Sequence, residues 1–115
     1  MDKKNILVIE DNEKHRFLLE NMLDDEGYRV ETAKDGDEVR EKIEGGGPFD
    51  LLMVDIAVPA FNAVEFIKEY KDKYKILVIS AFVEEVKGIL PAERQIKKPF
   101  DTFKLLDRIK EILSN

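Results

Sequence analysis

The sequence predicts an α/β fold: a doubly wound, five-stranded parallel sheet of order 2-1-3-4-5, flavodoxin-like, with helices on both faces. Short apolar runs alternate with helical patterns from end to end, and three of these runs have no polar residue inside them. Such runs are typical of parallel strands covered on both faces. Parallel strands are joined by right-handed crossovers that carry a helix. The length of 115 residues suits one domain of this kind, so we expect a single domain over residues 1–115.

The first strand is predicted over Asn5–Ile9, an apolar run rich in β-branched residues. A helix is predicted over residues 13 to 26, because leucines and Met22 recur there at helical spacing. Gly27 follows where a helix commonly takes a left-handed cap. The alternating run Tyr28–Ala33 then predicts a shorter strand.

A polar helix is predicted over residues 36 to 44, with only Val39 and Ile43 on its core face. It ends in three glycines and Pro48, which are strong helix breakers. No helix begins directly after these glycines, so they predict a tight connection rather than a cradle for phosphate. The apolar run Asp50–Val54 predicts the second buried strand.

The second half of the chain predicts a helix over residues 62 to 72 and a third buried strand over Lys75–Ile79. A short fourth helix is predicted from about Val83 to Leu90, where Pro91 stops it because the residue before a proline is driven out of the helical region. Arg94–Lys97 leaves room only for a brief strand.

The last helix is predicted from about Phe103 to Leu113, with Asp101 or Thr102 as its N-cap. Leucines and isoleucines fall on one face of this segment at helical spacing. The pattern therefore predicts five strands alternating with five helices, the fourth of them shortened.

Composition and charge narrow the classes of function. The chain has 19 basic and 25 acidic side chains, a net charge of −6 and no cysteine. The absence of cysteine excludes disulfide frameworks and thiolate metal sites, and the lack of a basic stripe argues against direct binding to nucleic acid. No signal peptide or membrane-length apolar run is evident. We expect a cytoplasmic protein that does not enter a membrane and whose partners are proteins or a metal ion.

Polar residues follow or end four of the predicted strands, at the edge where this strand order places its ligand crevice. They are Glu10 and Asp11 after the first strand, Asp55 after the third, Ser80 at the end of the fourth and Lys98 after the fifth. Three carboxylates in one crevice repel one another unless a cation joins them. Mg²⁺ prefers carboxylate oxygens and is the natural partner. The lysine could grip a phosphoryl group, and the serine could hydrogen-bond it.

Each of these residues also has a purely structural interpretation. A carboxylate at a strand end is commonly a turn former or a helix cap, and Asp11 could cap the helix that begins near Glu13. Ser80 could simply start a loop, and Lys98 with Pro99 could form a surface turn. The coincidence of all five residues at the ends of the appropriate strands favours a shared site.

At four places, in order, the residues resemble a known family. The matching segments are Ile6–Glu13, Asp50–Pro59, Ile79–Ala81 and Lys97–Phe100. The chain is similar there to bacterial response-regulator receiver domains, the CheY-like phosphoacceptor modules of two-component signalling. The segment Phe61–Ile67 also parallels the family's helix entry after the phosphorylated strand. The resemblance spans residues 4 to 114.

The resemblance implies a role for each residue of the predicted site. Asp55 would be the phosphoacceptor, and Ser80 and Lys98 would contact the phosphoryl group. The implied ligands of Mg²⁺ are Glu10, Asp11, Asp55 and the backbone carbonyl of Ala57. The resemblance also implies a cis peptide bond between Lys98 and Pro99.

Partners follow from the same resemblance. The phosphoryl group would come from a sensor histidine kinase or a phosphotransfer protein of a phosphorelay. Phosphorylation would switch binding to a downstream protein target or to an effector domain outside this sequence. The domain would not be an enzyme in the usual sense, because it would catalyse only its own phosphorylation and dephosphorylation.

The sequence departs from the family in three places. All three concern the surface through which family members pass the signal to their targets. Ala63 stands where the family often has glycine, and the stretch between Ser80 and Lys98 is short. Gln95 replaces the aromatic residue that usually lies three positions before the lysine and turns inward on phosphorylation. An inward swing of Gln95 would bury an amide, which is costly without a hydrogen-bond partner. We therefore expect the usual aromatic switch to be weak here.

Three alternatives use the same architecture. A Mg²⁺-dependent phosphatase of the haloacid dehalogenase type also forms an aspartyl phosphate, but its nucleophile lies on the first strand and is followed two residues later by a second aspartate, where Ala57 stands here. A flavin mononucleotide binder would hold a phosphate after the first strand, where Glu10 and Asp11 would repel it. A degenerate receiver would only bind protein, and the intact set of five residues argues against it.

Overall fold

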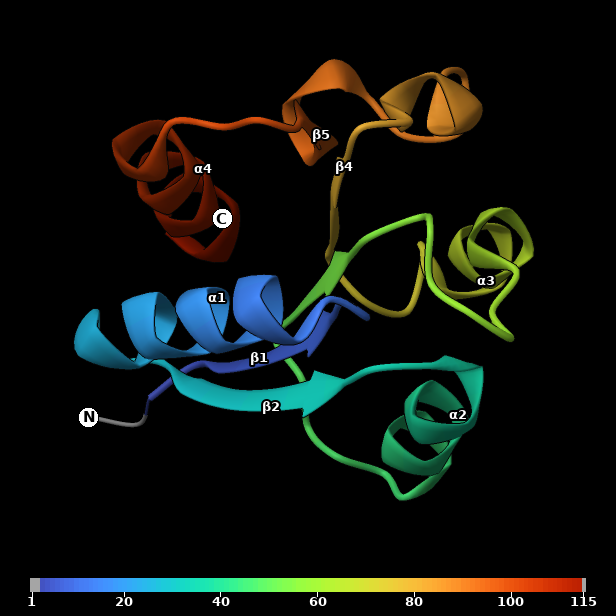
Figure 1. Cartoon of the computed structure of the whole chain (residues 1–115), viewed down its shortest axis with the longest axis horizontal. Coiled ribbons are helices and arrows are strands. Elements are labelled where there is room, and N and C mark those ends of the chain that lie inside the picture. The colour runs from blue at the N-terminus through green and yellow to red at the C-terminus, as the bar shows by residue number, and fades with distance from the viewer. Residues whose placement is uncertain (1–2, 115) are drawn as a thin grey trace.

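Five parallel strands form one sheet in the order β2-β1-β3-β4-β5 (Figure 1). The computed structural model describes residues 3–114. The strands are β1 Asn5–Ile9, β2 Arg29–Ala33, β3 Leu51–Val54, β4 Ile76–Ser80 and β5 Gln95–Lys97. The α-helices are α1 Glu13–Asp25, α2 Gly36–Glu44, α3 Ala63–Tyr70 and α4 Thr102–Ser114, and two 3₁₀ turns are η1 Val83–Val86 and η2 Ala92–Arg94. The predicted doubly wound sheet of order 2-1-3-4-5 is confirmed.

Different helices cover the two faces of the sheet, because successive residues of a strand point to opposite sides. On one face, Leu52 and Val78 pack with residues of α2 and α3. On the other, Met53 and Leu77 pack with residues of α1 and α4. Figure 1 shows these two pairs of helices on opposite sides of the strands. No helix within residues 3–114 combines the length and the apolar character needed to cross a membrane.

Side chains cap all four α-helices of residues 3–114 at their N-termini, with Asp35 capping α2 and Asn62 capping α3. The Asn12 side chain accepts the backbone N–H of His15 at the start of α1 (3.0 Å), so the capping alternative for Asp11 is wrong. The Asp101 carboxylate accepts the backbone N–H of Lys104 at the start of α4 (3.1 Å), which makes Asp101 the cap of the last helix. Each cap satisfies an N–H group that has no partner inside its helix.

The predicted fourth helix over Val83–Leu90 is wrong, and residues 3–114 contain four α-helices rather than five. The chain makes only the single turn η1 before Gly88 takes a left-handed conformation (φ +86°). Pro91 then stands in an extended conformation (ψ 161°) as the residue before η2, a position where its missing backbone N–H costs no helical hydrogen bond. Val86 and Leu90 are nevertheless buried against the face that α2 and α3 cover.

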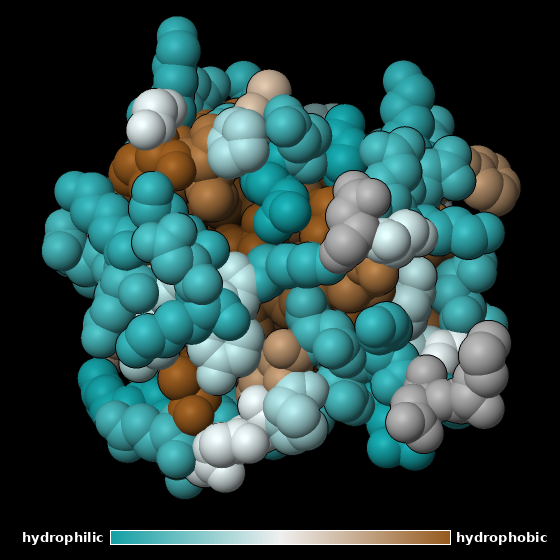
Figure 2. Space-filling model, turned by 180° about the vertical axis from the view of Figure 1, so that it is seen from behind, coloured by the Kyte–Doolittle hydropathy of each residue, from teal (hydrophilic) through white to brown (hydrophobic). Residues whose placement is uncertain are grey.

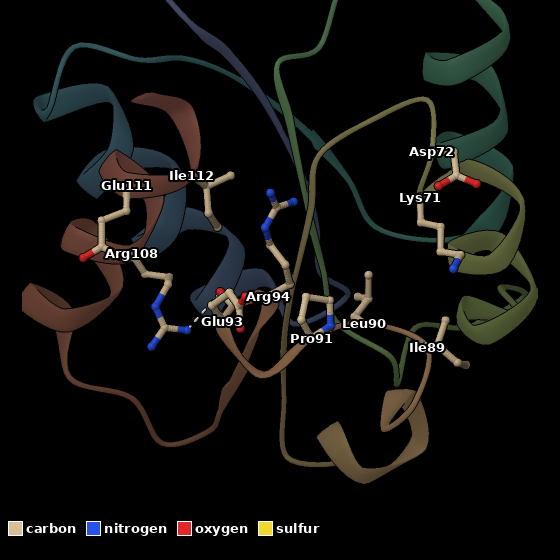
Figure 3. Close-up of a pocket in the computed structure, with 10 residues that line it drawn as sticks. All are labelled: Lys71, Asp72, Ile89, Leu90, Pro91, Glu93, Arg94, Arg108, Glu111 and Ile112. Atoms are coloured by element: carbon tan, nitrogen blue, oxygen red, sulfur yellow. Dashed lines mark hydrogen bonds between the residues drawn. The ribbon is translucent and has the colours of Figure 1, made fainter. Parts of the chain in front are cut away.

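A hollow of about 420 Å³ lies beside this irregular segment, between the end of α3, η2 and α4 (Figure 3). Ile89, Leu90 and Ile112 give it apolar walls, and positive and negative side chains share its rim. Arg108 on α4 donates a hydrogen bond to the Glu93 carbonyl (3.0 Å) and ties the two sides together.

Seen from behind, the molecule shows most of its visible hydrophobic residues in recesses between hydrophilic ones (Figure 2).

The loop after β3 presses against the first turn of α2. The Gly36 N–H donates to the Pro59 carbonyl (3.1 Å), and a Cβ at Gly36 would lie 1.7 Å from the Ala60 carbonyl oxygen. Only glycine fits such a close approach between two backbones. Ala60 itself has a left-handed conformation (φ 55°), which an L-residue adopts at a cost. The contact fixes where the chain leaves the carboxyl edge of the sheet.

Replacing Gly36 by Ala should therefore destabilise the protein by about 2 to 4 kcal/mol, because one of two backbone segments must move. Urea unfolding followed by circular dichroism measures this loss. Glu41→Ala, an exposed change on the same helix, should stay within about 0.5 kcal/mol of the unmodified chain. Equal stabilities of the two variants would contradict the close contact.

Candidate metal centre at the carboxyl edge of the sheet

The ladder of backbone hydrogen bonds continues past the strand ends and sets the predicted site residues in register. The Glu10 N–H donates to the Ala33 carbonyl of β2, and the Asp55 N–H donates to the Ile9 carbonyl of β1, both at 3.0 Å. The Lys98 N–H donates to the Ser80 carbonyl of β4 (3.1 Å). The residues therefore leave the sheet at one level, and their side chains share one edge.

Three carboxylates meet at this edge. Glu10, Asp11 and Asp55 each offer an oxygen, and these oxygens lie within 4.8 Å of one another. Glu10 is 2% exposed and Asp55 is 8% exposed, whereas Asp11 lies in solvent. Oxygen ligands in such a cluster, open on one side, suit a hard divalent cation that keeps some of its water.

Lys98 joins the two buried carboxylates. Its Nζ donates to Glu10 Oε1 at 2.6 Å and to Asp55 Oδ2 at 2.8 Å. The lysine side chain is 19% exposed, so the ion pairs are shielded from water on most sides. The peptide bond between Lys98 and Pro99 is cis. One positive charge thus offsets part of the repulsion between two carboxylates that the fold brings together.

The pKa values of this cluster move in different directions. Burial raises the pKa of Glu10, and the hydrogen bond from Lys98 offsets only part of that rise. Burial also acts to raise the pKa of Asp55, but the hydrogen bonds from Lys98 and from the Ala57 N–H outweigh it and hold that pKa below its usual value. Desolvation would lower the pKa of Lys98, yet its bonds to the two carboxylates raise it. Asp55 is therefore an ionised carboxylate beside a charged lysine at neutral pH.

Ser80 and Ala57 lie beside this cluster. Ser80 is fully buried at the end of β4, and its Oγ accepts the backbone N–H of Phe82 (3.1 Å). The Ala57 N–H donates to Asp55 Oδ1 (3.0 Å), so the first turn after β3 is folded around the aspartate. Each oxygen of Asp55 is thereby held by a different donor, one from Ala57 and one from Lys98.

Two residues of α1 contribute to the site and were not predicted from the sequence. Arg16 donates to the carbonyls of Glu10 (3.1 Å) and Asp11 (3.2 Å), which ties the acidic turn to the helix behind it. His15 Nδ1 lies 3.5 Å from Glu10 Oε1. Both residues fall in the first turn of the helix that follows the acidic pair, and this position was the only sequence signal available.

Gln95 does not point toward the carboxylates as a free switch side chain. Its amide donates to the Leu90 carbonyl (2.8 Å) and holds the irregular segment before η2 against β5. The hollow of Figure 3 is also remote from the carboxylates, because it lies where β4 and β5 begin. The hollow and the carboxylate cluster thus lie at opposite edges of the sheet.

Comparison with known proteins agrees with this geometry. Residues 6–110 match the response regulator receiver domain family. The chain belongs to that family. Members of the family act as phosphoacceptor modules in two-component signalling, and neither the phosphatase nor the degenerate-receiver alternative is needed to account for the chain.

Two curated relatives are regulators of greater length. Response regulator RR06 of Streptococcus pneumoniae serotype 2 is 36% identical over 115 residues, which covers 95% of this chain and 52% of RR06. The alkaline phosphatase synthesis transcriptional regulatory protein PhoP of Bacillus subtilis is 34% identical over 117 residues, covering 96% of this chain and 48% of PhoP. The chain spans about half the length of these relatives.

Solved receiver structures share the fold. Chemotaxis response regulator CheY4 of Vibrio cholerae is 28% identical with a TM-score of 0.82, covering 96% of this chain and 99% of CheY4. Response regulator TrrA of Thermotoga maritima, in complex with Mg(2+)-BeF, is 30% identical with a TM-score of 0.78, covering 95% of this chain and 98% of TrrA.

Lys98→Met should destabilise the metal-free protein by about 2 to 4 kcal/mol at pH 7, because it leaves Glu10 and Asp55 buried without their cation. The loss should shrink as the pH falls toward the raised pKa of Glu10, since protonation then removes the repulsion. Urea unfolding in EDTA at several pH values measures both effects.

Lys97→Met is the matched control, because Lys97 pairs with Glu84 on the exposed surface. It should cost less than about 1 kcal/mol at every pH. If the two lysine variants were equally stable, the buried ion pairs would contribute nothing to the fold.

Proposed function

We propose that Asp55 accepts a phosphoryl group from a phosphohistidine, in a Mg²⁺-dependent reaction in the bacterial cytoplasm, and that the domain then switches its binding to a partner. The donor is a sensor histidine kinase or a phosphotransfer protein. The observation that supports the proposal is a buried, ionised aspartate held between Lys98 and the Ala57 N–H at the ligand edge of the sheet. The domain catalyses only its own phosphorylation and dephosphorylation.

In the transfer, a carboxylate oxygen of Asp55 forms a bond to phosphorus while the phosphorus–nitrogen bond of the donor breaks. The electron pair of that bond stays on the imidazole nitrogen of the donor, which can take up a proton from solvent. Negative charge is spread over the phosphoryl oxygens as the bonds exchange. Lys98 already reaches Asp55 Oδ2 (2.8 Å), so its ammonium group can pair with one of these oxygens.

The three clustered carboxylate oxygens fit a divalent cation, and we propose that Glu10, Asp11 and Asp55 hold Mg²⁺ together with the backbone carbonyl of Ala57. When bound, Mg²⁺ supplies positive charge that neutralises the phosphoryl oxygens. Arg16 keeps the Glu10–Asp11 turn in position through its hydrogen bonds to the two carbonyls. TrrA, which is 30% identical, was solved with Mg(2+)-BeF.

Ser80 connects the site to the segment that follows β4. Its hydroxyl accepts the Phe82 N–H, and in the phosphorylated state it would donate to a phosphoryl oxygen. A rotation of this buried hydroxyl would loosen the turn that begins at Phe82. Because Gln95 is bonded to the Leu90 carbonyl, we propose that the change is carried by residues 81–94 themselves rather than by an inward ring.

A groove beside the carboxylates suits a docking helix of the kinase or phosphotransfer protein. Its volume is about 460 Å³, and α1 and the start of α4 form its walls around Glu10 and Lys98. Leu18 in its lining is 61% exposed, and Phe103, which directly follows the lining residue Thr102, is 79% exposed. Since the curated relatives are twice as long, the output is a downstream protein target or an effector domain.

Acetyl phosphate with Mg²⁺ should add one acid-stable, hydroxylamine-labile phosphoryl group to the chain, as intact-mass spectrometry would detect. Asp55→Asn should abolish it, because an amide oxygen is a poor nucleophile. Asp107→Asn, a change of the same kind on the exposed face of α4, should be labelled like the unmodified chain. Persistent labelling of Asp55→Asn would overturn the assignment.

Asp11→Ala should weaken Mg²⁺ binding and should not lower the melting temperature in EDTA. It removes one of three clustered carboxylates, while the cap of α1 is Asn12 and stays intact. Isothermal titration with Mg²⁺ and thermal melts in EDTA measure the two effects, with Asp107→Ala as control. A clear loss of stability in EDTA together with unchanged Mg²⁺ affinity would show that Asp11 is structural.

A further inference from the structure

A groove of about 340 Å³ runs between α2 and α3, on the face of the sheet away from α1 and α4. Figure 1 shows these two helices as neighbours at the right of the molecule. The groove starts where Gly36 meets Ala60 and extends along both helices to Glu44 and Tyr70. Among the residues that the structure describes, no helix or loop covers it.

Aromatic and aliphatic side chains line the groove. Phe61, Phe66 and Tyr70 form a continuous row, with ring centroids 5.1 Å apart for the first pair and 4.8 Å apart for the second. Ile43 of α2 faces them across the groove, and all four side chains are only partly buried. A ligand that covered this row would remove apolar surface from water, which is the main source of binding free energy for an apolar anchor.

Carboxylates dominate the rim of the groove. Glu44 ends α2 and Glu69 lies near the end of α3, and within residues 3–114 neither makes an ion pair or a hydrogen bond through its side chain. Glu44, Glu69 and Tyr70 line the same end of the groove. In keeping with this, burial and the nearby charges of Glu69, Tyr74 and Glu44 raise the pKa of Tyr70. The one positive lining residue, Arg40, is already paired with Asp37 (3.2 Å).

We propose that this groove binds a basic amphipathic segment of a partner protein. An aliphatic or aromatic anchor would lie on Phe61 and Phe66. An arginine or lysine one helical turn away would lie between Glu44 and Glu69. A cation there gains from two carboxylates that make no ion pair within residues 3–114. The nearby Tyr70 ring already has Lys73 Nζ over it, 5.4 Å from its centroid, so the carboxylates rather than the ring carry this contact. The net charge of −6 adds long-range attraction for a basic segment and repels an acidic one.

The groove is separate from the carboxylate cluster, and its binding does not depend on phosphorylation. No residue of the groove lining belongs to the set formed by Glu10, Asp11, Asp55 and Lys98. A failure of this proposal would therefore leave the phosphoacceptor role of Asp55 untouched, and the reverse also holds.

The test uses the whole chain and a phage-displayed library of helical peptides. Peptides are selected on the unmodified protein and counter-selected on the Glu44→Lys/Glu69→Lys double variant, which changes only exposed side chains. Enriched peptides should carry arginine or lysine three or four positions from a leucine, phenylalanine or tyrosine. The absence of enriched peptides, or enrichment of acidic ones, would overturn the proposal.

The best enriched peptide is then titrated against the protein. Amide shifts in ¹⁵N spectra should be centred on α2 and α3, and shifts centred on α1 or on α4 would contradict the proposed surface. The Glu44→Gln/Glu69→Gln variant should bind about tenfold more weakly, and the loss should diminish in high salt. The matched control Glu41→Gln/Glu85→Gln removes two exposed charges outside the groove. If both double variants weakened peptide binding equally, the loss of two negative charges would explain the effect wherever they lay, and the proposal would be overturned.

Discussion

The bonds of Lys98 to Glu10 and Asp55 are the constraint on which the rest of the site depends. The parallel sheet delivers two carboxylates to one buried edge, where their repulsion and desolvation oppose folding. A single lysine from the last strand connection reduces that cost and, in the same step, keeps Asp55 ionised. Stability and chemistry at this edge therefore rely on the same three side chains.

Short-range backbone contacts place these side chains with little freedom. The N–H groups of Glu10 and Asp55 extend the strand ladders, and the turn after Asp55 closes on its own carboxylate through the Ala57 N–H. Farther along that loop, the contact between Gly36 and Ala60 fixes its path against α2. A carboxylate held from both sides in this way has little conformational entropy left to lose when a ligand binds beside it.

Strands and most helices could be predicted from the sequence because uninterrupted apolar runs and helical spacing report burial directly. The segment from Val83 to Leu90 could not, because its apolar residues fit a helix while Gly88 adopts a left-handed conformation that the pattern does not reveal. The convergence of Glu10, Asp55 and Lys98 followed from strand order. The contributions of Arg16 and His15 depend on how α1 lies over the acidic turn, which no periodicity encodes.

The two hydrophobic clusters on opposite faces of the sheet share strands but not side chains. A change in side-chain packing on one face can therefore affect the other face only through the strand backbone between them. This separation lets the face of α2, α3 and residues 81–94 diverge while the α1 and α4 face stays constant. Substitutions on one face can therefore change which proteins bind there and leave the binding surface on the other face unaltered.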